Sequence, residues 1–163
     1  MKRREFIKSS VSGSLGASLA SHSLGASALE GGLQPRPAST RKILIAGGNF
    51  NTTYIKYMAQ LTGKARPRLC YLPTASADSD KAAVGWFQNC APLNVEAHVQ
   101  NMYIESLTQK LGWDEVLLSM DGIVASGGNT LNQQAIWKAQ GIDVILRQAW
   151  DKGIVLGLSL IHI

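Results

Sequence analysis

The stretch Asp121-Gly122-Ile123-Val124-Ala125-Ser126-Gly127-Gly128-Asn129-Thr130-Leu131 decides the fold, because it joins an apolar run to a paired-glycine turn and then to a helix start. Its continuous apolar part, residues 122–125, indicates a strand that is buried on both faces. Paired glycines let the backbone approach a ligand closely, and Asn129 or Thr130 can cap the following helix. Such a turn can aim backbone N–H groups at a developing oxyanion, but a plain strand-to-helix turn fits the pattern equally well.

The rest of the chain alternates short apolar runs with segments of helical spacing. Strands are predicted at 42–46, 68–72, 94–99, 122–125 and 154–156, and helices at 53–61, 80–90, 113–119, 131–139 and 142–150. In the second helix, Val84, Phe87 and Ala91 are expected to form the buried face. The alternation predicts an α/β fold of three layers, α/β/α, with a mostly parallel sheet. Right-handed crossovers place the carboxyl ends of all strands at one edge, where ligands bind in open sheets.

The run Gly153-Ile154-Val155-Leu156-Gly157-Leu158-Ser159 ends a predicted strand in the pattern Gly-x-Ser. In α/β hydrolytic enzymes this pattern is typical of a nucleophile elbow, a sharp turn that exposes a serine before the next helix. Ser159 is therefore the candidate nucleophile. Residues 158–163 resemble a non-native tail, so we expect the domain of residues 41–157 to be incomplete at its C-terminus, interrupted at the elbow. A natural terminus with a short apolar strand is the alternative.

The first 28 residues show the order of charge, apolar stretch and cleavage pattern that is typical of an export signal. Arg3 and Arg4 are followed by Phe6 and Lys8, which resembles the twin-arginine signal. The next stretch is rich in serine and glycine and too polar for a stable transmembrane helix, and cleavage is predicted after Ala28. Residues 29–40 are interpreted as a linker. The resemblance implies export by the twin-arginine machinery to the periplasm or the extracellular medium, and a disordered basic tail is the alternative.

Composition argues against several classes of function. The chain has 163 residues and a net charge of +5, and the predicted signal supplies three of these charges, so no basic cluster suited to nucleic acid remains. Two cysteines are too few for a disulfide framework. Cys70 is expected to be a buried apolar residue, and whether it pairs with Cys90 is left open. His98 is expected to have a structural or surface role. No His/Cys/carboxylate cluster has metal-ligand spacing, and no cofactor is expected.

Two segments resemble the peptidase E family of serine peptidases, family S51. One runs from Asp121 through the Gly-Gly-Asn-Thr turn to Gly157, and the other is 66–76, Arg-Pro-Arg-Leu-Cys-Tyr-Leu-Pro-Thr-Ala-Ser. The resemblance implies a flavodoxin-like arrangement of the class I glutamine amidotransferase-like type. The family elbow reads Gly-x-Ser-Ala-Gly, whereas Leu160 and Ile161 follow the serine here. Counting from the first glycine of the strand can also place the family serine at Leu160.

The resemblance implies a serine-type peptidase that hydrolyses small peptides next to aspartyl residues. Gly127 and Gly128 would border the oxyanion pocket, Asn129 would shape the turn and the substrate pocket, and Ser159 would attack the peptide carbonyl. In the family, the histidine and the acid that complete the triad follow the serine, so the chain as given is expected to be an inactive fragment. A cyanophycinase-like or amidotransferase-like enzyme, and a non-catalytic binding domain of the same fold, are the alternatives.

Overall fold

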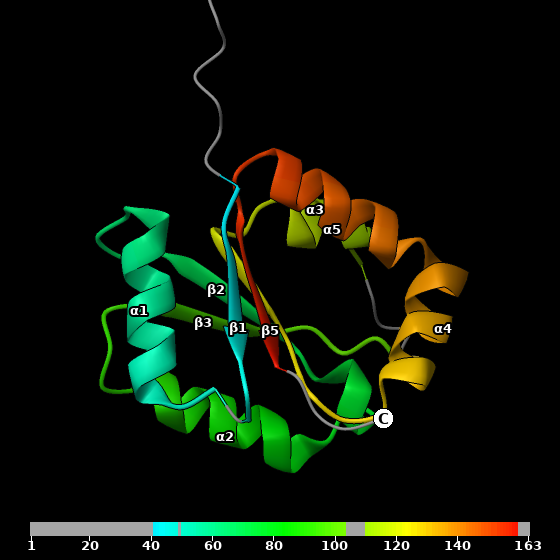
Figure 1. Cartoon of the computed structure of the whole chain (residues 1–163), viewed down its shortest axis with the longest axis horizontal. Helices are drawn as coiled ribbons and strands as arrows, with labels where there is room; N and C mark the ends of the chain where they lie inside the picture. Colours follow the sequence, from blue (N-terminus) through cyan, green and yellow to red (C-terminus); the bar gives the residue numbers. More distant parts are fainter. Residues whose placement is uncertain (1–40, 49, 104–109, 160–163) are drawn as a thin grey trace, which may run out of the picture. The chain divides into compact units, whose positions relative to one another are not determined.

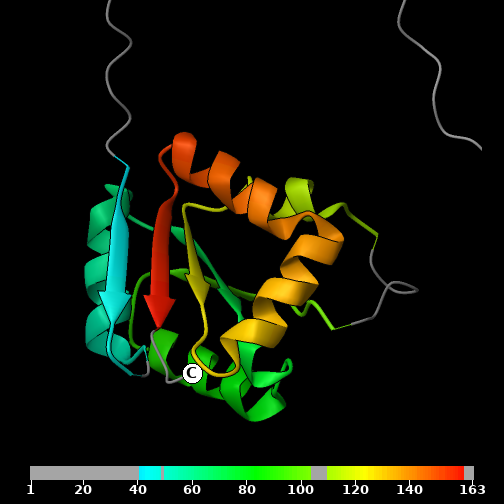
Figure 2. The ribbon, with the colours of Figure 1, turned by 45° about the vertical axis from the view of Figure 1, so that its right-hand side comes forward.

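The structure, a computed structural model, describes residues 41–48, 50–103 and 110–159. In these residues a single parallel sheet has the strand order β1-β5-β4-β2-β3 (Figure 1). The strands are β1 (Ile43–Ala46), β2 (Arg68–Leu72), β3 (Glu96–Val99), β4 (Gly122–Ala125) and β5 (Val155–Ser159). Figure 2 shows β1, β4 and β5 pointing the same way. The carboxyl ends of the strands therefore share one edge, as predicted.

Helices lie on both faces of the sheet, which confirms the predicted layers (Figure 1). They are α1 (Thr52–Thr62), α2 (Asp80–Cys90), α3 (Trp113–Leu117), α4 (Thr130–Gln140) and α5 (Ile142–Asp151). α1 and α2 pack on one face, and α3, α4 and α5 pack on the other. The predicted bounds are close to those observed. The clearest difference is β5, which continues to Ser159 instead of ending at Leu156.

The side chains of each strand alternate between two apolar cores. On β2, Leu69 joins the core under α1 and α2, whereas Cys70 joins the core under α3 and α5. All residues of β4 are buried, as the continuous apolar run predicts. Cys90 lies in the first core and Cys70 in the second, so the sheet separates the two cysteines. Both thiols are free, and no disulfide joins them.

The predicted buried face of α2 is wrong. Trp86 and Cys90 are 3% and 4% exposed, whereas Val84 and Phe87 are 55% and 47% exposed. The Trp86 ring stacks on Tyr71 of β2, with ring centroids 5.2 Å apart and planes inclined by 11°. Because this large aromatic contact buries more area than a valine could, it determines which side of the helix faces the sheet.

The strand order leaves a crevice between β2 and β4. These strands are hydrogen-bonded neighbours, yet the chain leaves β2 for α2 on one face and leaves β4 for α4 on the other. In open α/β sheets, ligands bind outside the carboxyl ends of the strands at such a point. The order also differs from the flavodoxin order 2-1-3-4-5, because β1 lies at the edge of the described sheet, beside β5.

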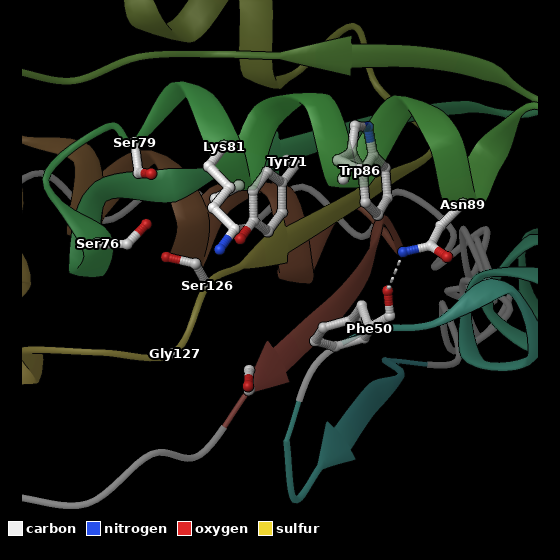
Figure 3. Close-up of a pocket in the computed structure, with 12 residues that line it drawn as sticks. Phe50, Tyr71, Ser76, Ser79, Lys81, Trp86, Asn89, Ser126 and Gly127 are labelled. Atoms are coloured by element: carbon white, nitrogen blue, oxygen red, sulfur yellow. Dashed lines mark hydrogen bonds between the residues drawn. The ribbon is translucent and has the colours of Figure 1, made fainter.

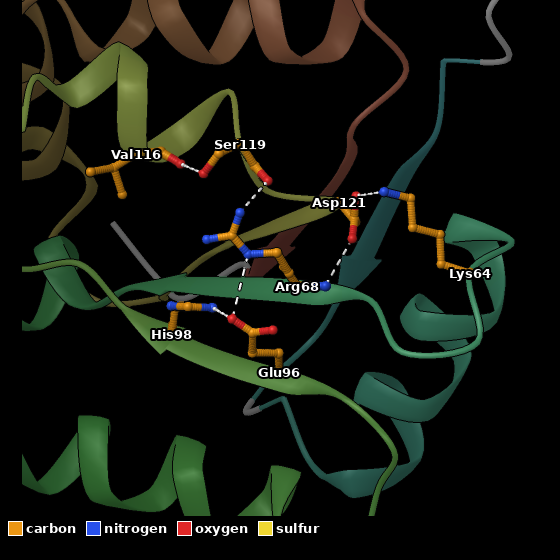
Figure 4. Close-up of polar contacts among 7 residues, drawn as sticks. All are labelled: Lys64, Arg68, Glu96, His98, Val116, Ser119 and Asp121. Atoms are coloured by element: carbon orange, nitrogen blue, oxygen red, sulfur yellow. Dashed lines mark hydrogen bonds and ion pairs between the residues drawn. The ribbon is translucent and has the colours of Figure 1, made fainter.

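A polar network connects the start of β2 with β3 and β4 (Figure 4). The Asp121 carboxylate accepts hydrogen bonds from Lys64 Nζ at 2.6 Å and from the backbone N–H of Arg68 at 2.9 Å. Glu96 lies near the Arg68 guanidinium, and its Oε1 is 2.9 Å from His98 Nε2. His98 thus takes part in a structural polar network, in line with the role expected for it.

The predicted export signal at 1–28 and the predicted linker at 29–40 lie outside the described residues, as do residues 160–163. The first two residues of the predicted tail, Leu158 and Ser159, complete β5 and pair with Ile45 and Ala46 of β1. Within the described ranges, no helix is long and apolar enough to cross a membrane.

The two cysteines provide a test of the packing. Burial raises the pKa of the Cys70 thiol and of the Cys90 thiol to about 12. Because the thiolate is the reactive form, only about one thiol in ten thousand is reactive at pH 8. We expect slow reaction with a thiol reagent in the folded chain and rapid reaction of both thiols in guanidinium. Cys70→Ala and Cys90→Ala variants show which thiol reacts at which rate. Fast labelling of the folded chain would contradict the burial of the two thiols.

Candidate active site

A pocket of about 390 Å³ opens at the carboxyl ends of the strands, beside α2 (Figure 3). Its wall combines aromatic rings, serine hydroxyls and one ammonium group. Its lining includes Tyr71, Trp86, Ser76, Ser126, Ser159 and Lys81. The pocket therefore lies at the crevice that the strand order predicts.

The Pro-Thr-Ala-Ser segment forms one wall of the pocket as a short 3₁₀ helix, Pro73–Ser76. Thr74 is fully buried, and its Oγ1 accepts a hydrogen bond from Trp137 Nε1 of α4 at 3.2 Å. Ser76 lines the pocket, and its hydroxyl donates to the carbonyl of Pro73 at 2.9 Å. The sequence pattern predicts that the strand stops at Pro73, but it does not predict this 3₁₀ helix. The helix places Ser76 beside the carboxyl ends of the strands.

The turn after β4 packs directly on this 3₁₀ helix. The backbone N–H of Asn129 donates to the carbonyl of Ala75 at 2.8 Å. A Cβ atom on Gly128 would lie 2.3 Å from that same carbonyl oxygen, and Gly128 has a φ of +144°. Glycine is therefore required here both by its backbone conformation and by the close approach of a second chain segment.

The predicted site residues of this turn have different roles. Gly127 lines the pocket. Gly128 packs against the backbone of Ala75. Asn129 caps α4, because its side-chain Oδ1 accepts a hydrogen bond from the backbone N–H of Asn132 at 2.9 Å. The N–H groups of Gly127 and Gly128 donate no hydrogen bond to any described residue. Of the two, Gly127 lines the pocket, so its N–H group is the donor of this turn that remains available to a ligand there.

Ser159 lies at the end of β5 and lines the same pocket as Gly127. It is 8% exposed, and its hydroxyl donates to the carbonyl of Gly48, in the turn after β1. It is the last residue of β5, and the residues that would form an elbow after it lie outside the described residues. The described histidine, His98, does not line the pocket. The alternative serine position, Leu160, lies outside the described residues.

Sequence reasoning missed Tyr71 and Ser126. Burial raises the pKa of Tyr71 above its ordinary value, and a hydrogen-bonding interaction with the Ser126 hydroxyl partly offsets that rise. Ser126 is 4% exposed, and among the described residues its Oγ has no partner with good hydrogen-bond geometry. The sequence position of Ser126 could have indicated its role, since Ser126 directly precedes the glycine pair at the end of a buried strand.

Asp78 binds the segment that follows β3. It has a φ of +52°, and its Oδ2 accepts hydrogen bonds from the backbone N–H groups of Met102 and Tyr103. Burial raises the pKa of Asp78, and these two hydrogen bonds lower it in part. The carboxylate thus positions the segment that follows β3, and nothing in the sequence pattern indicates this contact.

Across the part of the chain that the structure describes, no group of three or more histidine, cysteine, aspartate or glutamate residues could hold a metal ion.

Comparison with known proteins places this geometry in a family. The model of peptidase family S51 matches residues 43–159, so the chain belongs to peptidase family S51. An uncharacterised peptidase of Bacillus subtilis (strain 168), YgaJ, is 35% identical over 126 residues, which are 72% of this chain and 52% of YgaJ. The chain thus spans about half the length of that curated relative.

The fold agrees with a solved structure. The crystal structure of a candidate peptidase E from Listeria monocytogenes EGD-e superposes with a TM-score of 0.58 at 15% identity. The match covers 74% of this chain and 58% of the Listeria chain. At this identity the likeness concerns the fold alone, and it supports the open parallel sheet with helices on both faces.

The Gly128 contact predicts a specific difference between two glycines. Gly48 has a φ of +143°, close to that of Gly128, but a Cβ atom there would meet nothing within 4 Å. Alanine at either position should cost about 1–3 kcal/mol from backbone strain. Gly128→Ala should cost about 2 kcal/mol more than Gly48→Ala, because it also displaces the Ala75 carbonyl. Urea unfolding measures the difference, and equal losses would show that the contact is not constraining.

The Asp78 carboxylate predicts a second difference. Asp78→Ala removes the acceptor for two backbone N–H groups and should lower the free energy of unfolding by about 1–3 kcal/mol. Asp78→Asn keeps an acceptor oxygen and tolerates the positive φ, so it should cost less. Since folding raises the pKa of the Asp78 carboxyl, the folded chain binds a proton at Asp78 more tightly than the unfolded chain does. Wild type should therefore gain stability relative to Asp78→Asn as pH falls through the folded-state pKa, and a flat difference would contradict the shift.

Proposed function

We propose that the protein is a serine-type peptidase that hydrolyses peptide bonds next to aspartyl residues. The observation that carries the proposal is the pocket that brings Ser159 of β5 together with the turn after β4. That turn offers the N–H group of Gly127 to a ligand, and a serine hydroxyl that shares a pocket with such a donor is a combination used in acyl transfer. Membership of peptidase family S51 supports this chemistry.

In the proposed reaction, the Ser159 oxygen attacks the carbonyl carbon of the scissile bond, and the developing oxyanion accepts hydrogen bonds from the turn. A histidine oriented by an acid would take the serine proton and return it to the leaving amine. We propose that both come from the part of the family's sequence that follows residue 159. Before attack, the Ser159 hydroxyl must leave the Gly48 carbonyl to which it donates.

A second candidate function is a peptide-binding domain without catalysis. It is favoured by two observations: the Ser159 hydroxyl is engaged by a backbone carbonyl, and no described histidine lines the pocket. We further propose that residues 1–28 direct export through the twin-arginine pathway, as the paired arginines suggest. A cleaved, exported product beginning at residue 29 is the expected result, and retention of the full chain in the cytoplasm would contradict this.

The decisive test begins with the source gene, sequenced past codon 157. If the frame continues into Gly-x-Ser-Ala-Gly with a later histidine and acid, the protein made from the whole gene should release aspartate from aspartyl dipeptides. Replacing the elbow serine with alanine should lower kcat by about 10⁴-fold or more. Ser119→Ala, beside the polar network of Figure 4, is the matched control and should keep full activity. Aspartyl dipeptides that bind to the whole protein but are never cleaved would favour the binding domain instead.

A further inference from the structure

The pocket contains a positive charge that the proposed chemistry does not use. Lys81 is the ionised side chain among the described residues that line it, and none of those lining residues is acidic. No described carboxylate forms an ion pair with Lys81. Figure 3 shows the Lys81 amino group directed toward the side of the pocket where the Tyr71 hydroxyl lies. The pocket therefore presents a free cation to whatever enters it.

Two serine hydroxyls lie around this cation, and the interaction of one of them, Ser126, with Tyr71 has poor hydrogen-bond geometry. The Ser126 Oγ is buried without a hydrogen-bond partner of good geometry, although it lines the pocket. Buried hydroxyls are normally paired, so an orphaned one inside a pocket indicates a position for a ligand atom. Ser79 also lines the pocket, and as the residue before α2 it makes no side-chain capping hydrogen bond. Its hydroxyl remains available to a ligand.

The backbone adds a further positive contribution. α2 begins at Asp80 and runs for 11 residues, so its N-terminal end, next to Ser79, carries unpaired N–H groups. Two carboxylates, those of Asp78 and Asp80, lie close to Lys81 in the sequence. Asp78 is held by the N–H groups of Met102 and Tyr103, and Asp80 does not line the pocket. The groups facing the pocket are thus cationic or neutral donors.

We propose that Lys81, with the hydroxyls of Ser126 and Tyr71, forms a subsite that binds a carboxylate of the substrate. A carboxylate accepts several hydrogen bonds and pairs with an ammonium group, which this set supplies. The inference rests on the proposed function and assigns its specificity to residues of this chain. The carboxylate belongs either to an acidic side chain or to the free end of a short peptide, and the test separates these sources.

Binding can be measured on the chain itself, without turnover. NMR titrations would use three probes: N-acetyl-aspartyl methylamide, which has only the side-chain carboxylate; N-acetyl-asparagine, which has only the terminal one; and N-acetyl-asparaginyl methylamide, which has neither. At least one of the first two should bind more tightly than the third, and the tighter one names the source. Lys81→Gln should weaken that probe about tenfold, as expected for one charge-assisted hydrogen bond, and leave the third unchanged.

Two variants serve as controls. Lys81→Arg keeps the charge and should retain most of the affinity, while Lys56→Gln removes an exposed lysine from α1 and should change nothing. Ser126→Ala should weaken the same probe that Lys81→Gln weakens. Equal binding of all three probes, or an equal loss for all three in Lys81→Gln, would overturn the subsite. If the whole protein with Lys81→Gln still cleaves aspartyl peptides with an unchanged preference for aspartate, the subsite is refuted and the peptidase stands. If the carboxylate probes bind but the whole protein cleaves no peptide, the peptidase is refuted and the subsite stands.

Discussion

The close approach of the Ala75 carbonyl to the turn at Gly128 is the constraint on which the pocket depends. It joins the segment after β2 to the segment after β4 by the Asn129 hydrogen bond of 2.8 Å, with no room for a side chain between them. Since β2 and β4 are neighbouring strands, this contact fixes how their extensions leave the sheet. Ser76 on one side and Gly127 on the other are thereby held at the rim of a single pocket.

The two segments that carried the family resemblance are therefore one structural unit. Thr74 is tied to α4 through Trp137, and Asn129 caps the same helix, so both ends of the contact are anchored to α4. This leaves different tasks to adjacent residues, because Gly128 and Asn129 maintain the packing while Ser126 and Gly127 face the pocket. A residue's position in a motif thus does not reveal whether it touches a ligand.

The fold could be predicted from the sequence because it depends on long apolar runs and helical spacing. The run 122–125 indicates a strand buried on both sides, and all of its residues are buried. The face of α2 could not be predicted, since Val84 and Phe87 fit an apolar stripe as well as Trp86 and Cys90 do. The stacking of Trp86 on Tyr71 decided between them. The site was predictable at Gly127 and Ser159, which stand in recognisable strand-end motifs, whereas Lys81 and Tyr71 reach the pocket through tertiary packing and follow no local pattern.

The pairing of β1 with β5 has a consequence for how the chain folds. Ile43 lies opposite Leu156, so the first and last strands of the described sheet are neighbours. At a synthesis rate of about 5–20 residues per second, β1 leaves the ribosome on the order of ten seconds before its partner exists. Pairings so distant in sequence close late, because the entropy of the intervening chain is lost before the contacts form. We therefore expect the side of the pocket where Ser159 meets Gly48 to form after the β2–β4 side.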